Sequence, residues 1–447
     1  MSQLLGKKSN LFFRKKVVKI VLIFLTIAIA LNQWFYAQLF YRNLPFFKLF
    51  SSLFFWNLLV LLMWIFYKVF FFKRTRINIQ IANLFRSVII VASFTLPSIL
   101  TTLMRDGIGY NTLEGLKFVS GILLAIAISD LLRDEKIFLF ILILIIYLIQ
   151  VGFGIAQLII GISFNTPESF FTVGVLNRWW GLDSIWGTFS LSGKNSYGIC
   201  LAFCTIIIGN FAMLTSRKRL QKFLFTTMPL AAICIYFSHS RTAIVCLSVF
   251  IVIRFWKMLK EGKLLLFMLS VVSVFSVFLI YIIFKTAPSW VFDSRSLIAR
   301  LLQQKNALES MSSNIFFGNG YNSVLSNSIN FSGSRALINS SNKFSGLSTD
   351  NFFLRRFLET GILGAVSFIY FLMHLLKLDG PKNLPKSQFQ IEKKLLVKQI
   401  WMTLLFACLS FDYFSNQTNV CLFSLLLCYC VNMCDENSDR IKIRRAN

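Results

Sequence analysis

The chain has 447 residues, of which 56% are hydrophobic and 14% are charged, and its mean hydropathy is +0.68. This composition excludes an ordinary soluble enzyme and is typical of a polytopic helical membrane protein. The formal net charge of +28 would suit a nucleic-acid partner, but the positions of the basic residues along the chain give it another explanation.

The apolar stretches predict an all-α fold with about twelve transmembrane helices in one transmembrane domain, residues 1–447. The hydrocarbon core of a bilayer is about 30 Å thick, so each crossing needs roughly 20 apolar residues. No small-residue cleavage site follows the first stretch, which we therefore interpret as a helix and not as a signal peptide. The predicted spans are 17–37, 49–72, 79–104, 115–132, 137–162, 197–214, 223–238, 241–256, 264–284, 351–373, 396–413 and 417–433.

The basic residues predict the orientation of these spans. Most of the 46 Lys and Arg residues fall in alternate connecting segments, as the positive-inside rule requires when both termini are cytoplasmic. Anionic lipids of the inner leaflet then account for the charge without a nucleic-acid partner. The basic clusters lie at residues 7–16, 73–76, 217–222, 257–263, 377–394 and 440–445.

The sequence contains no recognisable metal or cofactor site. The nine Cys residues lack the spacing of metal ligands, and we interpret them as small apolar packing residues. Residues 193–195 read Gly-Lys-Asn, but the glycine spacing does not fit a phosphate-binding P-loop and Asn195 replaces its Ser or Thr. We therefore expect neither a metal nor a cofactor.

Two of the predicted external segments are long, residues 163–196 and residues 285–350. The first combines three Trp residues with Arg178, Asp183 and Lys194. Indoles beside charged groups are expected at a membrane surface, and aromatic faces beside polar groups would also suit a sugar ring. An aromatic belt and a substrate-binding surface are both compatible with this segment.

A polar turn of Ser238, His239, Ser240 and Arg241 interrupts two apolar stretches in the middle of the chain. Residues 223–256 hold both stretches and are fewer than the roughly 40 residues that two full crossings need. We therefore expect the turn to lie in the outer half of the bilayer, where it must be inside protein or line a wet cavity. An Arg there is a candidate functional residue, and a side chain that reaches the headgroups is the alternative.

The external segment 285–350 is rich in Ser and Asn. Arg300 lies near the start of a predicted amphipathic helix along the membrane, where a solvated helix face is the alternative account of its charge. The sequence FFGNGYN follows, and its two glycines predict a tight turn. Asp350 ends the segment just before a predicted span, where it can serve as a helix N-cap or as a general base.

These external groups have a common chemistry. An Arg side chain donates paired hydrogen bonds to phosphate and stays charged when partly desolvated. A carboxylate can accept the proton of an attacking hydroxyl group. Together they suffice for metal-independent glycosyl transfer from a lipid-linked diphosphate, which is one of several reactions that the spacing allows.

Four motifs follow one another in the order found in the superfamily of bacterial O-antigen ligases and polymerases, which this chain resembles. The resemblance implies about twelve helices, with one large periplasmic loop before the tenth. It also implies a multi-pass protein of the bacterial inner membrane with a periplasmic active face. The motifs are GTFSLSGKNSYG (187–198), SHSRTA (238–243), RLLQQKNAL (300–308) leading to FFGNGYN, and DNFFLRRFLETGILG (350–364).

The resemblance implies roles for particular residues. Arg241 and Arg300 would contact the undecaprenyl-linked diphosphate, and Asn195 and Asn351 would shape the pocket. The predicted catalytic residues are Asp350, Arg241 and Arg300, and the predicted substrate-binding residues are Arg178, Lys194, Asn195, Asn351 and Arg355.

Asp350 stands where ligases of this superfamily typically have a His. We therefore favour a polymerase of undecaprenyl-diphosphate-linked oligosaccharide repeat units, as in O-antigen, capsule or exopolysaccharide synthesis, with an O-antigen ligase as the alternative. The expected partners are the lipid-linked glycan, membrane lipids and other polysaccharide-assembly proteins. A flippase for lipid-linked sugars is the rival of another class, but internal repeats and helices broken by Gly or Pro in both halves, which mark many transporters, are not evident.

Overall fold

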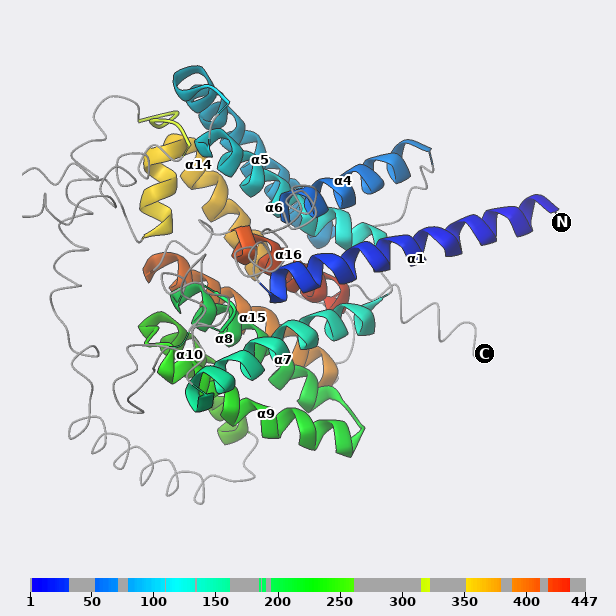
Figure 1. Ribbon diagram of the computed structural model, residues 1–447, viewed down its shortest axis with the longest axis vertical. Helices are drawn as coiled ribbons and strands as arrows, with labels where there is room; N and C mark the ends of the chain where they lie inside the picture. The colour runs from blue at the N-terminus through cyan, green and yellow to red at the C-terminus, as the bar shows by residue number, and fades with distance from the viewer. Residues whose placement is uncertain are drawn as a thin grey trace, which may run out of the picture.

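The computed structural model describes residues 2–31, 53–70, 79–108, 110–132, 135–160, 185, 187–189, 194–260, 315–321, 351–378, 388–410 and 417–434. Within these ranges the chain is helical apart from short turns, and it contains no β-strand. The all-α prediction is thus confirmed for the described part of the chain (Figure 1). The helices are α1 (Ser2–Ala30), α4 (Leu53–Phe70), α5 (Ile79–Asp106), α6 (Tyr110–Leu131), α7 (Lys136–Ile160), α8 (Lys194–Leu214), α9 (Lys218–Phe237), α10 (Arg241–Lys260), α14 (Phe352–Leu376), α15 (Gln388–Ser410) and α16 (Gln417–Cys434).

Among the described residues, six helices are long and apolar enough to cross a membrane, namely α5, α6, α7, α8, α9 and α14. Helices α4 and α16 contain shorter apolar stretches, Leu53–Phe66 and Gln417–Met433. The other predicted spans at 17–37, 241–256 and 396–413 overlap the helices α1, α10 and α15, which do not meet that criterion. The predicted span 264–284 lies outside the described residues.

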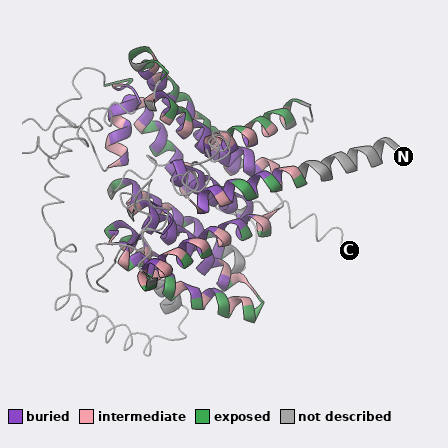
Figure 2. Cartoon of the chain, viewed as in Figure 1, coloured by how far each residue is buried: buried purple, intermediate pink, exposed green. Residues whose placement is uncertain are grey.

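The outer faces of the helices are strongly apolar. Leu62 on α4 is 60% exposed, and Val366 on α14 is 55% exposed. Figure 2 shows such exposed positions along the outside of the bundle, with buried positions facing inward. A soluble monomer rarely exposes large contiguous apolar surfaces, whereas a lipid environment requires them. The chain is a polytopic helical membrane protein.

Helix α16 lies in the middle of the bundle (Figure 1), where it packs against α6, α7 and α15. Its described side chains are buried from Gln417 to Met433, as expected for a helix that is apolar on all sides. Three of its cysteines pack there. All eight described cysteines are buried and free, which confirms the packing interpretation for them: Cys200, Cys204, Cys234, Cys246, Cys408, Cys421, Cys428 and Cys430.

Helix α14 is broken. Gly361 has φ 68° and ψ −170°, a conformation outside the helical region, which a residue with a Cβ rarely adopts. The sequence led us not to expect helices broken by Gly or Pro in both halves of the chain, and the break in α14 lies in the second half. Helix α5, which packs against α14, also contains a proline, Pro97.

Candidate functional site

The turn at residues 238–241 connects two helices that are longer than their apolar stretches. Helices α9 and α10 have 20 residues each, and 20 residues span about 30 Å. The helical ends at Lys218 and Lys260 extend both helices beyond the apolar stretches that the prediction counted, and the depth of the turn in a bilayer stays a prediction. The turn is nevertheless buried, since neither Ser238 nor Ser240 is accessible to solvent.

Local hydrogen bonds explain the shape of this turn. The Ser238 hydroxyl donates to the carbonyl of Ile235 at 2.7 Å. The Ser240 hydroxyl accepts from the backbone N–H of Ala243 at 3.3 Å, which is the geometry of a helix N-cap. His239 between them has a φ of 54°. Arg241 is then the first residue of α10, and its side chain is exposed.

Arg241 and Lys194 both begin helices, α10 and α8. The N-terminus of a helix carries partial positive charge from its unpaired N–H groups, so a basic residue there adds to an existing positive potential. Helix N-termini are favourable places for phosphate and carboxylate groups. These two positions are therefore suited to an anionic ligand.

Helices α8 and α10 meet at Gly198. A Cβ on Gly198 would lie 2.8 Å from the Ser238 hydroxyl and 2.9 Å from the Cβ of Ser240, so only glycine permits this approach. The contact brings the start of α8, with Lys194 and Asn195, beside the 238–241 turn. The structure thus joins the GTFSLSGKNSYG and SHSRTA motifs.

The first residues of the GTFSLSGKNSYG motif are held by buried amide groups. Gly187 donates its N–H to the Gln157 side chain at 2.8 Å and accepts from it at 2.9 Å. The Thr188 hydroxyl donates to the carbonyl of Ala30 at 2.8 Å, and Gln150 donates to both groups at 2.7 and 2.6 Å. Gly187 and Thr188 therefore have a packing role that fixes the segment before α8.

The N-cap of α14 is Asn351. Its side chain accepts a hydrogen bond from the backbone N–H of Leu354 at 3.1 Å. The capping role that the sequence left open for Asp350 therefore belongs to Asn351. The half-buried Asn351 side chain, predicted to shape the pocket, stabilises the start of the helix that follows Asp350.

A buried ionic cluster lies in the first half of α14. The Nε atom of Arg355 donates to Oε1 of Glu359 at 2.7 Å, and Nη1 of Arg356 lies 3.6 Å from Oε2 of the same residue. Their exposed fractions are 5%, 4% and 0%. Charges buried this deeply need partners, and Glu359 provides one for both arginines.

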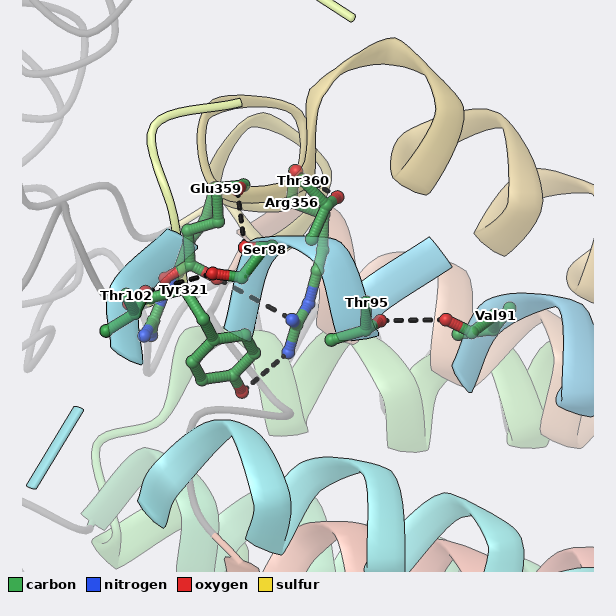
Figure 3. A network of polar contacts seen from close by, with 9 residues as sticks. Val91, Thr95, Ser98, Thr102, Tyr321, Arg356, Glu359 and Thr360 are labelled. Carbon is green, nitrogen blue, oxygen red and sulfur yellow. Dashed lines mark hydrogen bonds and ion pairs between the residues drawn. The ribbon is translucent and has the colours of Figure 1, made fainter. Parts of the chain in front are cut away.

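Arg356 is enclosed by aromatic rings. Its guanidinium carbon lies 3.8 Å from the ring centroid of Phe118, 4.8 Å from that of Tyr321 and 4.9 Å from that of Phe352, distances at which a cation is attracted to the ring face. Nη2 also donates to the Tyr321 hydroxyl at 3.0 Å (Figure 3). Burial raises the pKa of Tyr321 to about 12, so the phenol is neutral at physiological pH.

Residues 315–321, which contain FFGNGY, dock against the break in α14. Gly320 donates its N–H to the carbonyl of Glu359 at 3.2 Å, and the Ser98 hydroxyl of α5 donates to the same carbonyl at 2.7 Å (Figure 3). Ile362 in turn donates its N–H to the carbonyl of Ile315 at 2.9 Å. Backbone groups released by the break are thus paired within the protein, as buried polar groups must be.

The structure places the predicted site residues in two groups. Lys194, Asn195 and Arg241 lie where α8 begins beside the 238–241 turn, and Asn351 and Arg355 lie in the first half of α14. Helix α15 packs against α8, α10 and α14. Three other predicted residues lie outside the described residues, and their roles stay predictions: Asp350, Arg300 and Arg178.

The predicted site did not include Arg356, Glu359, Tyr321 and Ser98. One signal was available in the sequence, because an acidic residue within an otherwise apolar span is costly and marks a structural or functional position. The aromatic enclosure of Arg356 combines Phe352, four residues earlier on α14, with Phe118 and Tyr321, which are distant in sequence and gave no local signal.

Residues 225–369 match the family model described as O-antigen ligase. That range includes the 238–241 turn, the 315–321 segment and the broken half of α14, whereas the GTFSLSGKNSYG motif precedes it. No curated protein matches the chain.

Proposed function

Because this chain belongs to the superfamily of O-antigen ligases and polymerases, we propose that it transfers a glycan from an undecaprenyl-diphosphate carrier to an acceptor hydroxyl group. Within the superfamily we favour a polymerase that joins lipid-linked repeat units. The reason is that Asp350 stands in place of the His typical of ligases.

The reaction assigns a task to each predicted catalytic residue. The carboxylate of Asp350 accepts the proton of the acceptor hydroxyl as its oxygen attacks the anomeric carbon. The bond from that carbon to the phosphate oxygen breaks, and the lipid diphosphate leaves with the bonding electrons. Arg241 and Arg300 stabilise the charge that develops on the departing diphosphate. No metal or nucleotide is required in this scheme.

The observation that carries this proposal is the position of Arg241. It is an exposed cation at the N-terminus of α10, and Gly198 of α8 packs against Ser238 and Ser240 of the turn before it, so side-chain charge and helix dipole favour an anion there. We assign Lys194, Asn195 and Arg178 to binding the donor here. Asn351 and Arg355 would position the acceptor side, next to Asp350.

The O-antigen ligase is the second candidate, and the description of the matched family favours it. The two differ in acceptor. A polymerase extends another lipid-linked glycan, whereas a ligase transfers the glycan to lipid A core. Both use the same donor, so the donor-binding residues would be the same.

A flippase is a weaker candidate. Broken helices in transporters often leave backbone groups at the break for the substrate or an ion. In α14 the carbonyl of Glu359 at the break accepts from Ser98 and Gly320. The break therefore joins α14 to its neighbours and leaves this carbonyl already paired.

The proposed topology has twelve spans, cytoplasmic termini and a periplasmic active face in the inner membrane. Residues 163–196 and 285–350 are then external. Two described ion pairs are compatible with this alternation of helix direction. Lys68 near the end of α4 contacts Asp130 near the end of α6 at 2.7 Å, and Lys19 of α1 contacts Glu135 before α7 at 2.9 Å. In the proposed topology α4 and α6 run in the same direction, as do α1 and α7, so both partners of each pair would lie on the same side of the membrane.

Reconstitution tests the proposed reaction. The purified protein in vesicles is given lipid-linked repeat units, without nucleotide or divalent metal, and the products are separated by size. A ladder of longer glycans supports the polymerase. Transfer only to added lipid A core supports the ligase, and movement of the unchanged substrate between leaflets supports the flippase.

A further inference from the structure

Exposed apolar residues lie where the 315–321 segment meets the end of α5 and the break in α14. Ile315, Phe316 and Phe317 are 49%, 67% and 61% exposed, and Met104 near the end of α5 and Ile108 just after it are 86% and 87% exposed; together they are called the patch. Covering apolar surface is favourable by about 25 cal/mol per Å². Burial of these two neighbouring, exposed phenyl rings is therefore favourable.

The backbone of the segment keeps these rings facing outward. The carbonyl of Ile315 accepts from the N–H of Ile362. A Cβ on Gly361 would lie 2.1 Å from the carbonyl oxygen of Phe316, so the two chains are in direct backbone contact. The segment cannot rotate to bury Phe316 and Phe317 without breaking these contacts.

The patch continues the apolar outer faces of the two helices. On α14, Ile362 beside Ile315 is 40% exposed, and Val366, one turn further along, is 55% exposed. On α5, Leu100 is 52% exposed and lies one turn before Met104. Exposed apolar residues at helical spacing on a membrane protein face lipid, so the same lipid surface extends to the patch.

We propose that residues 315–317 form a membrane anchor that inserts into the lipid at the boundary between acyl chains and headgroups. Arg105 supports this depth. Its exposed side chain donates from Nη1 to the carbonyl of Asn319 at 3.1 Å, so a cation that can bind lipid phosphates lies beside the anchor. Aromatic and basic side chains together are characteristic of that boundary.

This inference requires only that α5 and α14 cross a membrane, and it is independent of glycosyl transfer. The test uses Phe316→Cys in the full-length protein, labelled with an environment-sensitive thiol fluorophore and reconstituted in phosphatidylethanolamine and phosphatidylglycerol vesicles. The eight described native cysteines are buried, and labelled protein without the substitution gives the background. Lipids that carry a quencher near the headgroup or near the acyl-chain end are then compared with a water-soluble quencher.

Two control positions calibrate the result. Val366→Cys reports the acyl-chain region, and Ser216→Cys reports water, because Ser216 is an exposed residue between α8 and α9. We expect the label at position 316 to lose most fluorescence with the headgroup-level lipid quencher, and the label at 366 with the deep one. Quenching at 316 only from water would overturn the proposal. So would protection from every quencher, since another part of the chain or a second copy would then cover the patch.

Discussion

Gly318 lies against the backbone of Glu359, so that a Cβ on Gly318 would stand 2.4 Å from the carbonyl carbon of Glu359. The two residues come from the FFGNGYN and DNFFLRRFLETGILG motifs. Their contact is a finding that neither motif shows alone. It makes the glycines of both motifs parts of one joint.

Gly318→Ala is expected to destabilise the protein. The residue has a φ of 74°, which costs a residue with a Cβ about 1–2 kcal/mol, and the overlap with Glu359 adds about 1–3 kcal/mol. Thermal unfolding in detergent should show a lower Tm. Gly152→Ala on α7 is the control, because a Cβ there meets nothing within 4 Å. Equal Tm values for the two variants would contradict the close packing of Gly318 against Glu359.

Removing the carboxylate of Glu359 should lower the stability of the protein more than removing a partly exposed carboxylate does. Glu359→Gln leaves Arg355 and Arg356 buried without their anionic partner, a change that typically costs about 3–5 kcal/mol. Glu114→Gln is the control, since the pair of Glu114 with Lys117 on α6 is less buried and should contribute under about 1 kcal/mol. The Tm values of the two variants and of wild type provide the comparison. A similar small shift for both would show that the α14 cluster is not a stabilising pair.

Arg241→Ala should abolish the glycan ladder while the Tm stays close to that of wild type, because the Arg241 side chain is exposed. Arg241→Lys should retain part of the activity, since it keeps the charge but loses the paired donors. Arg219→Ala, an exposed Arg on α9, is the matched control. Unchanged product length in Arg241→Ala would exclude the diphosphate role.

Asp350 can be tested by a choice of replacements. Asp350→Ala should abolish transfer, and Asp350→Asn should do the same because an amide cannot accept the proton. Asp350→His, which restores the residue of the ligase pattern, should keep measurable activity. The size distribution of products and the protein yield from membranes are compared in parallel. Normal ladders from Asp350→Asn would rule out a general base at this position.

Asn351 should tolerate other capping residues. Asn351→Ala removes the cap of α14 and should cost about 1 kcal/mol. Asn351→Ser can cap the helix, and its Tm should approach that of wild type. If Asn351→Ser restores stability but not glycan transfer, the side chain also contacts substrate. If it restores both, capping is its whole contribution.

Tyr321→Phe should lower stability by the same amount at every pH from 6 to 9. The substitution leaves a hydrogen-bond donor of buried Arg356 without its acceptor, which costs about 1–3 kcal/mol. Because burial raises the pKa of Tyr321 to about 12, the phenol is neutral in both folded and unfolded protein below pH 9, and its contribution is lost only as the pH rises toward that value. A Tm difference that changes between pH 6 and 9 would assign the effect to another group.

The positions of the helices could be predicted because each apolar stretch must pair its backbone groups internally when it crosses lipid. The predicted bounds differ from the observed ones where charged residues extend a helix. Lys218 and Lys260 lie in α9 and α10, and a count of apolar residues alone does not include them.

The candidate site was predicted less completely than the fold. The motif order led to Lys194, Asn195 and Arg241, at the starts of two helices that pack together at Gly198, and their roles stay predictions. The joint between Gly318 and Glu359 depends on contacts between residues distant in sequence, and neither residue alone predicts it. The choice of Asn351 over Asp350 as the cap depends on one residue of helix register, which a pattern of polar residues cannot settle.

The docked segment 315–321 also changes how the chain between α10 and α14 is closed. A single connection from residue 261 to residue 350 would have its ends fixed only at the two helices. Residues 315–321 are held by both α5 and α14. The chain from α10 to α14 is therefore attached to the helix bundle at a third point as well as at its two ends.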